Sequence, residues 1–181
     1  MQYPWYLTLE GYSSELQQGD LIPDCPIVVP PNNIIEGSNM DVEVSLIDSV
    51  ILSQSCDLEN DKIQIVLVCP YFSLKTFLSQ MKEQNKKSKE KAIENLKRGN
   101  LPGYHLINKD ESIQILSDYT VVDFRNIYGI QINALSNLVS KLEIRYRLLS
   151  PYREHLSQAF ARFFMRVGLP QDINVPSDYI A

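Results

Sequence analysis

The chain has 181 residues, of which 44% are hydrophobic and 22% charged, and its net charge is −5 at pH 7. These values are typical of a globular protein, so we expect one domain over residues 1–181. No apolar run approaches the roughly 20 residues that span a bilayer, and the first residues lack a leader pattern. We therefore expect a cytoplasmic protein with no membrane partner, and the negative charge disfavours general attraction to nucleic acid.

The first half of the chain is predicted to be rich in β-strands. Gly19-Asp20-Leu21-Ile22 leads into a proline-rich segment, which predicts a loop over 23–40 with one short edge strand at 27–29. The stretches 42–53 and 63–69 have strand character. The six residues 57–62 between them are rich in turn formers, so the two stretches predict a β-hairpin.

A helical insertion is predicted at about 73–100. Apolar residues at 74, 77, 78 and 81 recur at helical spacing and predict a helix over 73–84. The segment 82–98 carries seven basic and three acidic side chains, a net charge of +4. It is typical of an exposed helix or flexible excursion, with a phosphate-binding arm as the alternative.

The second half is predicted to return to strands. Three short strands are expected at 104–108, 112–116 and 119–127, followed by a short helix at 131–141. Within 142–149, apolar residues alternate with Glu143, Arg145 and Arg147, which is the pattern of a half-buried strand.

A terminal amphipathic helix is predicted from Pro151 to Val167, with Ser150 as its cap and Gly168 and Pro170 as its end. Its apolar side is either part of the domain's own core or an interface for a protein partner or a second copy. That side consists of Leu156, Ala159, Phe160, Phe163, Phe164 and Val167.

A polar cluster follows the strand predicted at 42–53, and it consists of Ser53, Gln54, Ser55, Cys56 and Asp57. Ser and Asp side chains cap turns, so the cluster is either a polar turn or a polar recognition site. A third hypothesis is a Cys-dependent hydrolase, in which His105 or His155 would activate Cys56. No nucleophile-elbow glycine pattern supports that hypothesis.

The cysteines and histidines do not predict a metal centre. Cys25, Cys56 and Cys69 form no Cys-x-x-Cys pair, and the chain has only two histidines. This spacing argues against both a zinc site and a disulfide framework. We therefore expect no metal and no cofactor.

Two further places could bind an anion. Arg125 either points outward at a groove or pairs with Asp123. Tyr152, Arg153, Glu154 and His155 occupy the first turn of the terminal helix. Free N–H groups and the helix dipole favour an anion there, although Tyr152 and His155 could instead only hold the helix on the sheet.

Three segments resemble the MazF/PemK (CcdB-like) toxin family. Gly19-Asp20-Leu21-Ile22 is similar to the start of that family's first strand, and SVILSQSCDLENDKIQIVLVCPYFS resembles its second and third strands. VVDFRNIYGIQINAL resembles a later segment in which an aspartate and a basic residue precede a short helix. The resemblance implies a small SH3-like barrel, often dimeric, with endoribonuclease activity in the toxins.

This chain departs from the family at the residues that the resemblance would make catalytic. No arginine precedes the second strand, where the sequence reads Ile47-Asp48-Ser49, and only Ser73 can replace the hydroxyl that follows Cys-Pro. Loss of one donor that stabilises the reacting phosphate typically costs about 2.7–4 kcal/mol of barrier. The resemblance therefore implies a degraded ribonuclease site.

The predicted fold is a β-rich α+β protein: a MazF-like, SH3-like barrel with a Lys-rich helical insertion and a C-terminal amphipathic helix. The predicted function is a regulatory interaction module of a bacterial toxin–antitoxin or antiphage system. It would bind a protein partner, or a second copy as a homodimer, and RNA is a further candidate partner. Its expected binding residues are Ser53, Gln54, Asp57, Tyr152, Arg153, Phe160, Phe163 and Phe164. The alternative is a sequence-specific RNA endonuclease whose rearranged site consists of Ser55, Ser73, Arg125 and His155.

Overall fold

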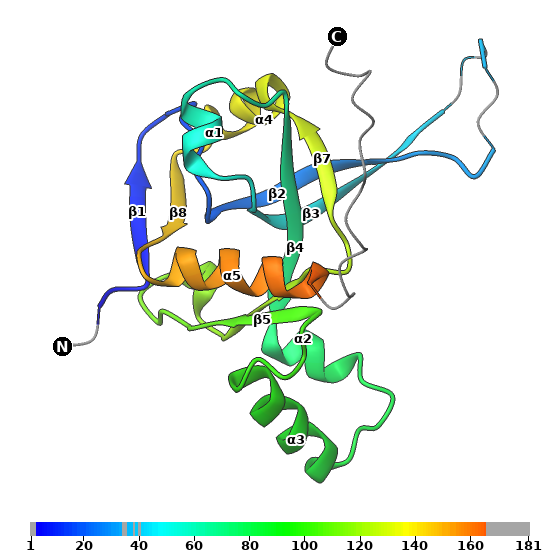
Figure 1. The fold of residues 1–181 in the computed structure, drawn as a ribbon, viewed down its shortest axis with the longest axis vertical. Helices are drawn as coiled ribbons and strands as arrows, with labels where there is room; N and C mark the ends of the chain where they lie inside the picture. Colours follow the sequence, from blue (N-terminus) through cyan, green and yellow to red (C-terminus); the bar gives the residue numbers. More distant parts are fainter. Residues whose placement is uncertain (1–2, 34–35, 38, 40, 166–181) are drawn as a thin grey trace, which may run out of the picture.

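The computed structural model describes residues 3–33, 36–37, 39 and 41–165. An antiparallel sheet organises these residues (Figure 1), and helices pack on it and extend from one end. The sheet order is β1 (Tyr6–Glu10), β8 (Ile144–Leu148), β2 (Asp20–Val29), β3 (Glu43–Ile51), β4 (Ile65–Ser73), β6 (Thr120–Asp123) and β5 (Tyr104–Ile107), and β7 (Tyr128–Gln131) pairs with β4 off this path. The helices are α1 (Ser55–Glu59), α2 (Leu74–Ser79), α3 (Lys86–Lys97), α4 (Ile132–Val139) and α5 (Tyr152–Phe164), with a 3₁₀ turn η1 (Gln114–Leu116).

The β-rich α+β class is confirmed. The strand pairings run in one path from β1 to β5, and among the described strands no pair joins these two ends. Closure into an SH3-like barrel therefore stays a prediction.

The hairpin predicted from the two central stretches is confirmed. β3 and β4 pair antiparallel from Ser49 opposite Pro70 to Ile51 opposite Val68. β4 extends further than predicted because it changes partners at Pro70: its first half also pairs with β7, and its second half pairs with β6. The predicted turn over 57–62 is in part helical, since α1 begins at Ser55.

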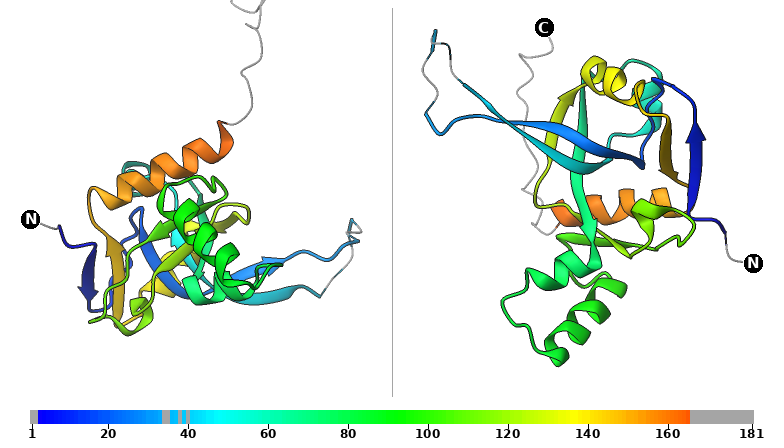
Figure 2. Two further views of the ribbon diagram at one scale, coloured as in Figure 1. Left: turned by 90° about the horizontal axis from the view of Figure 1, so that it is seen from below. Right: turned by 180° about the vertical axis from the view of Figure 1, so that it is seen from behind.

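The loop predicted over 23–26 is wrong, because β2 runs through Pro23 and Pro26. The short strand predicted at 27–29 is present as the end of β2. The register of β2 against β3 shifts between Ile22 and Cys25, which marks a bulge. Prolines are tolerated at such irregular places, where the ladder does not need their missing N–H. Figures 1 and 2 show the β2–β3 hairpin extending away from the rest of the sheet.

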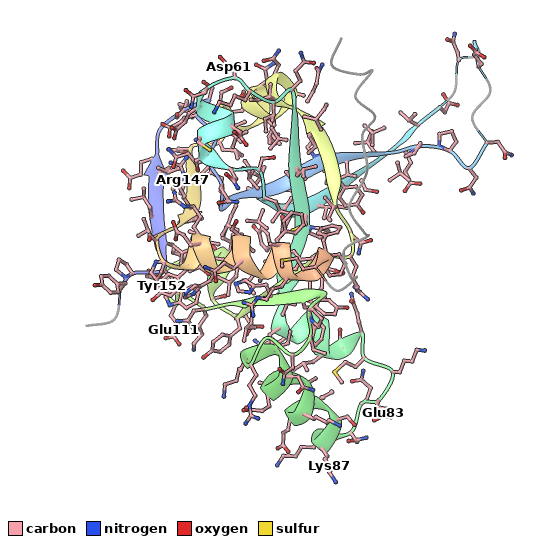
Figure 3. All side chains as sticks on the ribbon, in the orientation of Figure 1. Asp61, Glu83, Lys87, Glu111, Arg147 and Tyr152 are labelled. Carbon is pink, nitrogen blue, oxygen red and sulfur yellow. The ribbon has the colours of Figure 1, made fainter. Side chains whose placement is uncertain are left out.

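The solvent exposure expected for the arginines of β8 is wrong. Arg145 and Arg147 are 2% and 7% exposed, whereas Ile144 is 48% exposed. Both guanidinium groups donate to the buried carboxylate of Asp20: Arg145 Nη1 and Arg147 Nη2 each lie 3.1 Å from Oδ2. Arg147 is seen beside β8 and β2 in Figure 3. Charges can be buried here because each one has an opposite partner.

Two of the three short strands expected after residue 100 need correction. The segment 112–116 contains η1 rather than a strand, because the Asp110 carboxylate accepts hydrogen bonds from the N–H and hydroxyl of Ser112 and makes a turn. The segment 119–127 divides into β6 and a turn before β7. Asp123 forms that turn by accepting hydrogen bonds from Arg125 N and Asn126 Nδ2.

The helices predicted at 131–141 and after Pro151 are present as α4 and α5. The cap of α5 was predicted one position too early: Pro151 is the capping residue, and it makes no side-chain hydrogen bond. The predicted end of the helix at Val167, Gly168 and Pro170 lies outside the described residues.

The insertion predicted at 73–100 is present as a lobe of α2 and α3 at one end of the molecule (Figure 1). Its apolar residues, among them Leu74, Phe77 and Leu96, form one cluster with Val121 of β6. A second cluster lies between α5 and the sheet, around Phe124 and Leu156, and a third lies around Leu135 and Val139 of α4. None of the helices in the described part of the chain is long and apolar enough to cross a bilayer.

Candidate functional site

The polar cluster after β3 satisfies backbone N–H groups of β4 and of the segment before β2. Ser53 Oγ accepts a hydrogen bond from Leu67 N at 2.8 Å, and Ser55 Oγ accepts one from Gln18 N at 3.1 Å. Gln54 precedes the helix and makes no side-chain cap. These contacts support the polar-turn interpretation.

Cys56 is exposed on α1, and its Sγ lies 3.7 Å from both Gln54 Oε1 and Asp57 Oδ1. His105 belongs to β5 and His155 to α5, and neither forms a hydrogen bond with Cys56 in the described structure. The arrangement gives the hydrolase hypothesis no support. Within the described residues, no group of three His, Cys, Asp or Glu side chains is placed to hold a metal ion.

The structure places the four candidate nuclease residues on different elements. Ser55 begins α1, and Ser73 caps α2 by accepting a hydrogen bond from Thr76 N. Arg125 lies in the turn before β7, and His155 lies on α5. No hydrogen bond or ion pair links any two of them in the described part of the chain, so they do not form a connected site here.

Arg125 pairs with Asp123, which confirms one of its two interpretations. Arg125 Nε and Nη2 lie 2.9 and 2.8 Å from the two carboxylate oxygens of Asp123. Burial alone would raise the pKa of Asp123, but hydrogen bonds from Arg125 and Asn126 hold that pKa below its usual value. The guanidinium carbon also lies 4.4 Å from the centre of the Tyr104 ring.

The first turn of α5 is occupied by contacts within the protein. The N–H groups of Tyr152 and Arg153 both donate to the carbonyl of Leu149. The Tyr152 ring stacks on Trp5 at a centroid distance of 3.5 Å. Arg153 pairs with Glu154 at 3.0 Å. These contacts support the interpretation that this turn holds the helix on the sheet.

The phenylalanines of α5 divide into two groups. Phe160 and Phe163 pack against the core, with their ring centres 5.5 and 6.3 Å from that of Phe124. Phe164 is 57% exposed and contacts the rings of both neighbours. The first two residues therefore belong to the core, and only Phe164 presents a large apolar surface to solvent.

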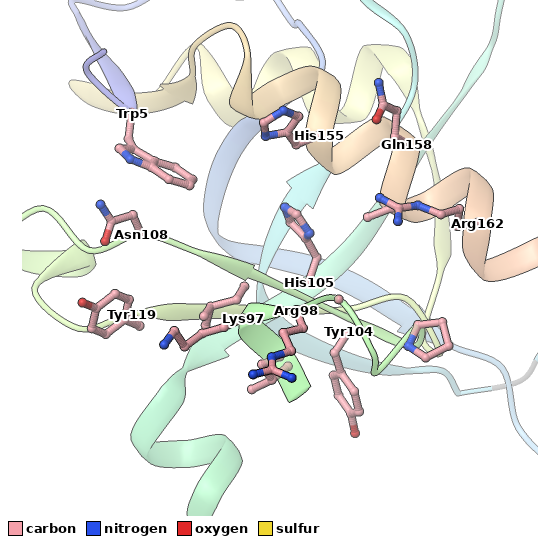
Figure 4. A pocket seen from close by; sticks show the side chains of 15 residues that line it. Trp5, Lys97, Arg98, Tyr104, His105, Asn108, Tyr119, His155, Gln158 and Arg162 are labelled. Atoms are coloured by element: carbon pink, nitrogen blue, oxygen red, sulfur yellow. The ribbon is translucent and has the colours of Figure 1, made fainter. Parts of the chain in front are cut away.

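A cavity of about 630 Å³ lies where α5, β5 and the C-terminal end of α3 meet (Figure 4). Its size falls within the usual range of small-ligand sites. Its wall consists of Trp5, Leu96, Lys97, Arg98, Gly99, Pro102, Tyr104, His105, Leu106, Asn108, Tyr119, His155, Gln158, Ala159 and Arg162.

The helical period explains which residues of α5 line the cavity. His155, Gln158, Ala159 and Arg162 are separated by three, four and seven positions, so they share one face of the helix. An adjacent face carries Leu156, which is completely buried. One helix therefore supplies both core packing and a polar cavity wall.

The cavity wall is cationic. Lys97, Arg98 and Arg162 line it, and no Asp or Glu among the described residues does. Glu94 pairs with Lys97 at 3.3 Å and with Arg98 at 2.7 Å, and thereby offsets part of their charge. Arg162 forms no ion pair with any described residue, so its full charge acts on the cavity.

His105 stays neutral at physiological pH. Burial, together with nearby His155 and Arg162, lowers the pKa of His105 to about 4. Figure 4 shows His105 and His155 facing each other from β5 and α5. In the part of the chain that the structure describes, neither imidazole hydrogen-bonds to a carboxylate that would orient it for acid–base catalysis.

Aromatic side chains complete the cavity wall. Trp5, Tyr104 and Tyr119 line it from three separate segments. Aromatic faces stack on nucleobases, and Lys and Arg side chains bind phosphate. The wall therefore combines the two kinds of group that a single-stranded nucleic acid requires.

The sequence analysis named His105 and His155 in other contexts and did not assign Trp5, Tyr119 or Asn108 to a site. One signal was present: His155, Gln158 and Arg162 follow helical spacing opposite the phenylalanines. Trp5 and Tyr119 could not be found in this way, since they reach the cavity only through the pairing of distant strands.

The chain matches no protein-family model, and no curated protein matches it significantly. The MazF/PemK resemblance accordingly stays a prediction.

Proposed function

We propose that the protein is a regulatory interaction module whose cavity between α5, β5 and α3 binds single-stranded nucleic acid without cleaving it. The carrying observation is the composition of the cavity wall: three cationic side chains and three aromatic rings, with no carboxylate among the described residues. RNA is the favoured form, in line with the MazF-like resemblance and a toxin–antitoxin or antiphage setting. An SH3-like barrel and a homodimer remain part of this proposal.

Binding is favoured over cleavage by the placement of the polar groups. A general base works best with a pKa near the operating pH, whereas the pKa of His105 is about 4. The four residues of the nuclease alternative lie on separate elements. A neutral imidazole in a cationic wall can still hydrogen-bond to a base or a sugar.

The test is fluorescence anisotropy with a 5′-labelled ten-nucleotide oligouridine at low salt, followed by a denaturing gel of the same sample. We expect saturable binding that weakens with salt, and intact RNA on the gel. The double variant Arg98→Gln/Arg162→Gln should weaken binding by at least about ten-fold, because a hydrogen bond to a charged group contributes about 1.5–3 kcal/mol.

The matched control is Lys82→Gln/Lys87→Gln, which removes the same charge outside the cavity wall; Lys87 lies at the tip of the lobe in Figure 3. This control should lose little affinity. Equal losses in the two double variants would show that RNA is held by diffuse charge and would contradict the proposed site. RNA fragments that appear with the wild type and are lost in Arg125→Ala or Ser55→Ala would favour the nuclease alternative.

Two competitors identify the ligand class. A ten-nucleotide DNA oligonucleotide, used as a competitor, shows whether the protein prefers RNA or binds any single strand. Polyglutamate of equal charge offers no base to stack on Trp5, Tyr104 or Tyr119, so we expect it to compete poorly. Efficient competition by polyglutamate would instead indicate an acidic protein partner.

A further inference from the structure

A second cavity of about 500 Å³ adjoins the first. It opens between α2 and α3, and its wall consists of Phe77, Gln80, Met81, Glu83, Ser88, Lys91, Ala92, Asn95, Leu101, Tyr104 and Arg125. Tyr104 is the one residue that the two walls share. The two cavities therefore meet at this ring.

Tyr104 is held in place from two sides. The Phe77 ring meets it edge to face at a centroid distance of 5.0 Å. The Arg125 guanidinium lies over its face at 4.4 Å, a typical cation–π distance. A ring fixed at the junction of the two cavities, with one face covered by Arg125, can line the path of a strand that passes from one cavity to the other.

Arg125 is oriented toward the second cavity by its pairing with Asp123. The two hydrogen bonds to that carboxylate use Nε and Nη2, and they leave N–H groups on Nη1 and Nη2 for a further acceptor. The Arg125 side chain is 55% exposed. Lys91 adds a second cation to the same wall, opposite a single acidic residue, Glu83. The second cavity thus has a fixed donor for phosphate beside an aromatic ring.

We propose that the second cavity is a further nucleotide subsite, in which Arg125 binds a phosphate of the strand after it has passed Tyr104. This inference rests on the proposed function, because the strand must first occupy the larger cavity. It also gives a role to the Lys-rich insertion, whose helix α3 contributes to both walls.

The subsite makes affinity depend on the length of the ligand. The test compares uridine dinucleotide with ten-nucleotide oligouridine on the wild type and on Arg125→Gln, by competition against the labelled oligonucleotide. We expect the wild type to bind the longer ligand at least ten-fold more tightly. Arg125→Gln should lose most of that difference, and its affinity for the dinucleotide should stay within two-fold of the wild type. The salt-dependence slope should fall by about 0.7 for the lost phosphate contact.

Arg125→Gln also removes the charged partner of Asp123 and could change the local structure, so a second variant is needed. Lys91→Gln changes an exposed residue of the second wall, and Lys87→Gln is its control outside both walls. Lys91→Gln should also reduce only the affinity for the longer ligand. If the wild type binds the longer ligand at least ten-fold more tightly but neither variant reduces that difference, the second subsite is wrong and the first cavity stands. If the wild type binds neither ligand, both proposals fail.

Discussion

At the scale of single residues, Asp20 is the position at which we expect the largest effect on stability. Its carboxylate is fully buried and pairs with Arg145 and Arg147, whose side chains are 1% and 8% exposed. Asp20→Asn leaves buried Arg145 without a counter-charge and leaves Arg147 with only the exposed Glu15, 3.3 Å away. Breaking a buried pair in this way typically costs about 3–5 kcal/mol. Urea unfolding measures this loss.

The control for that change is Glu90→Gln, which removes an exposed carboxylate paired with Lys86 at 3.8 Å. Exposed pairs contribute about 0–1 kcal/mol, so the midpoint of unfolding should move little. Equal losses in Asp20→Asn and Glu90→Gln would contradict the interpretation that Asp20 compensates the two arginines.

His105 should make the protein less stable in mild acid. Its pKa is lowered from 6.5 to about 4 in the folded protein, so the unfolded chain takes up a proton at higher pH than the folded chain does. The contribution of neutral His105 is therefore present above pH 6.5 and is lost as the pH falls toward 4, by roughly 3 kcal/mol in all. His105→Gln should flatten the dependence of the free energy of unfolding on pH in this window. An unchanged profile would show that His105 does not have a lowered pKa.

The three cysteines should differ sharply in reactivity. Cys56 is exposed, while Cys25 and Cys69 are buried. Burial raises the pKa of Cys25 to about 11 and raises that of Cys69 as well, and both effects suppress the reactive thiolate. Alkylation of the native protein followed by peptide mass analysis should therefore label Cys56 first. Labelling of Cys25 at a similar rate would contradict the buried position of β2.

At the scale of elements, α5 offers two neighbouring phenylalanines with different environments. Phe163→Ala removes a ring packed on Phe124 and should lower the free energy of unfolding by about 3 kcal/mol. Phe164→Ala removes an exposed ring and should change stability by less than about 0.5 kcal/mol. Thermal unfolding of the two variants measures both effects.

The variants Phe163→Ala and Phe164→Ala also test whether α5 is an assembly element. If a protein partner or a second copy docks on this helix, Phe164→Ala should weaken association in sedimentation experiments while the protomer stays folded. A wild type that sediments as a monomer at all concentrations would contradict the homodimer. A large stability loss in Phe164→Ala would contradict its exposed position.

The sequence predicts elements well where one local pattern decides the structure. The β3–β4 hairpin, α4 and α5 follow from apolar patterning. The burial of Arg145 and Arg147 in β8 was missed because it depends on Asp20, which is more than a hundred residues away. The extent of β2 was missed since its prolines lie beside a bulge that only pairing with β3 creates.

The candidate site was less predictable for the same reason. Its α5 wall follows from helical spacing, and the basic residues of α3 were visible as a charged run. Trp5, Tyr104 and Tyr119 reach the cavity because strands that are distant in sequence pair within one sheet. No local pattern encodes that convergence.

At the scale of the whole molecule, the charge of the cavity wall is opposite to the net charge of the chain. The chain carries a net charge of −5, yet the cavity wall presents Lys97, Arg98 and Arg162. The overall negative charge should keep non-specific binding to double-stranded nucleic acid weak. We therefore expect a duplex of the same sequence to bind much less tightly than the single strand, in a direct anisotropy comparison. Equal affinity for duplex and single strand would contradict a role for stacking in the cavity.

The most direct measurement uses Trp5, which is the only tryptophan of the chain and belongs to the cavity wall. Its emission is recorded while single-stranded oligouridine is added at low salt, to the wild type and to Arg98→Gln/Arg162→Gln. We predict saturable quenching in the wild type, since a base stacked in the cavity contacts the indole, and a midpoint shifted at least ten-fold in the variant. Emission that does not respond to RNA, or that responds equally in both proteins, would contradict the proposed cavity.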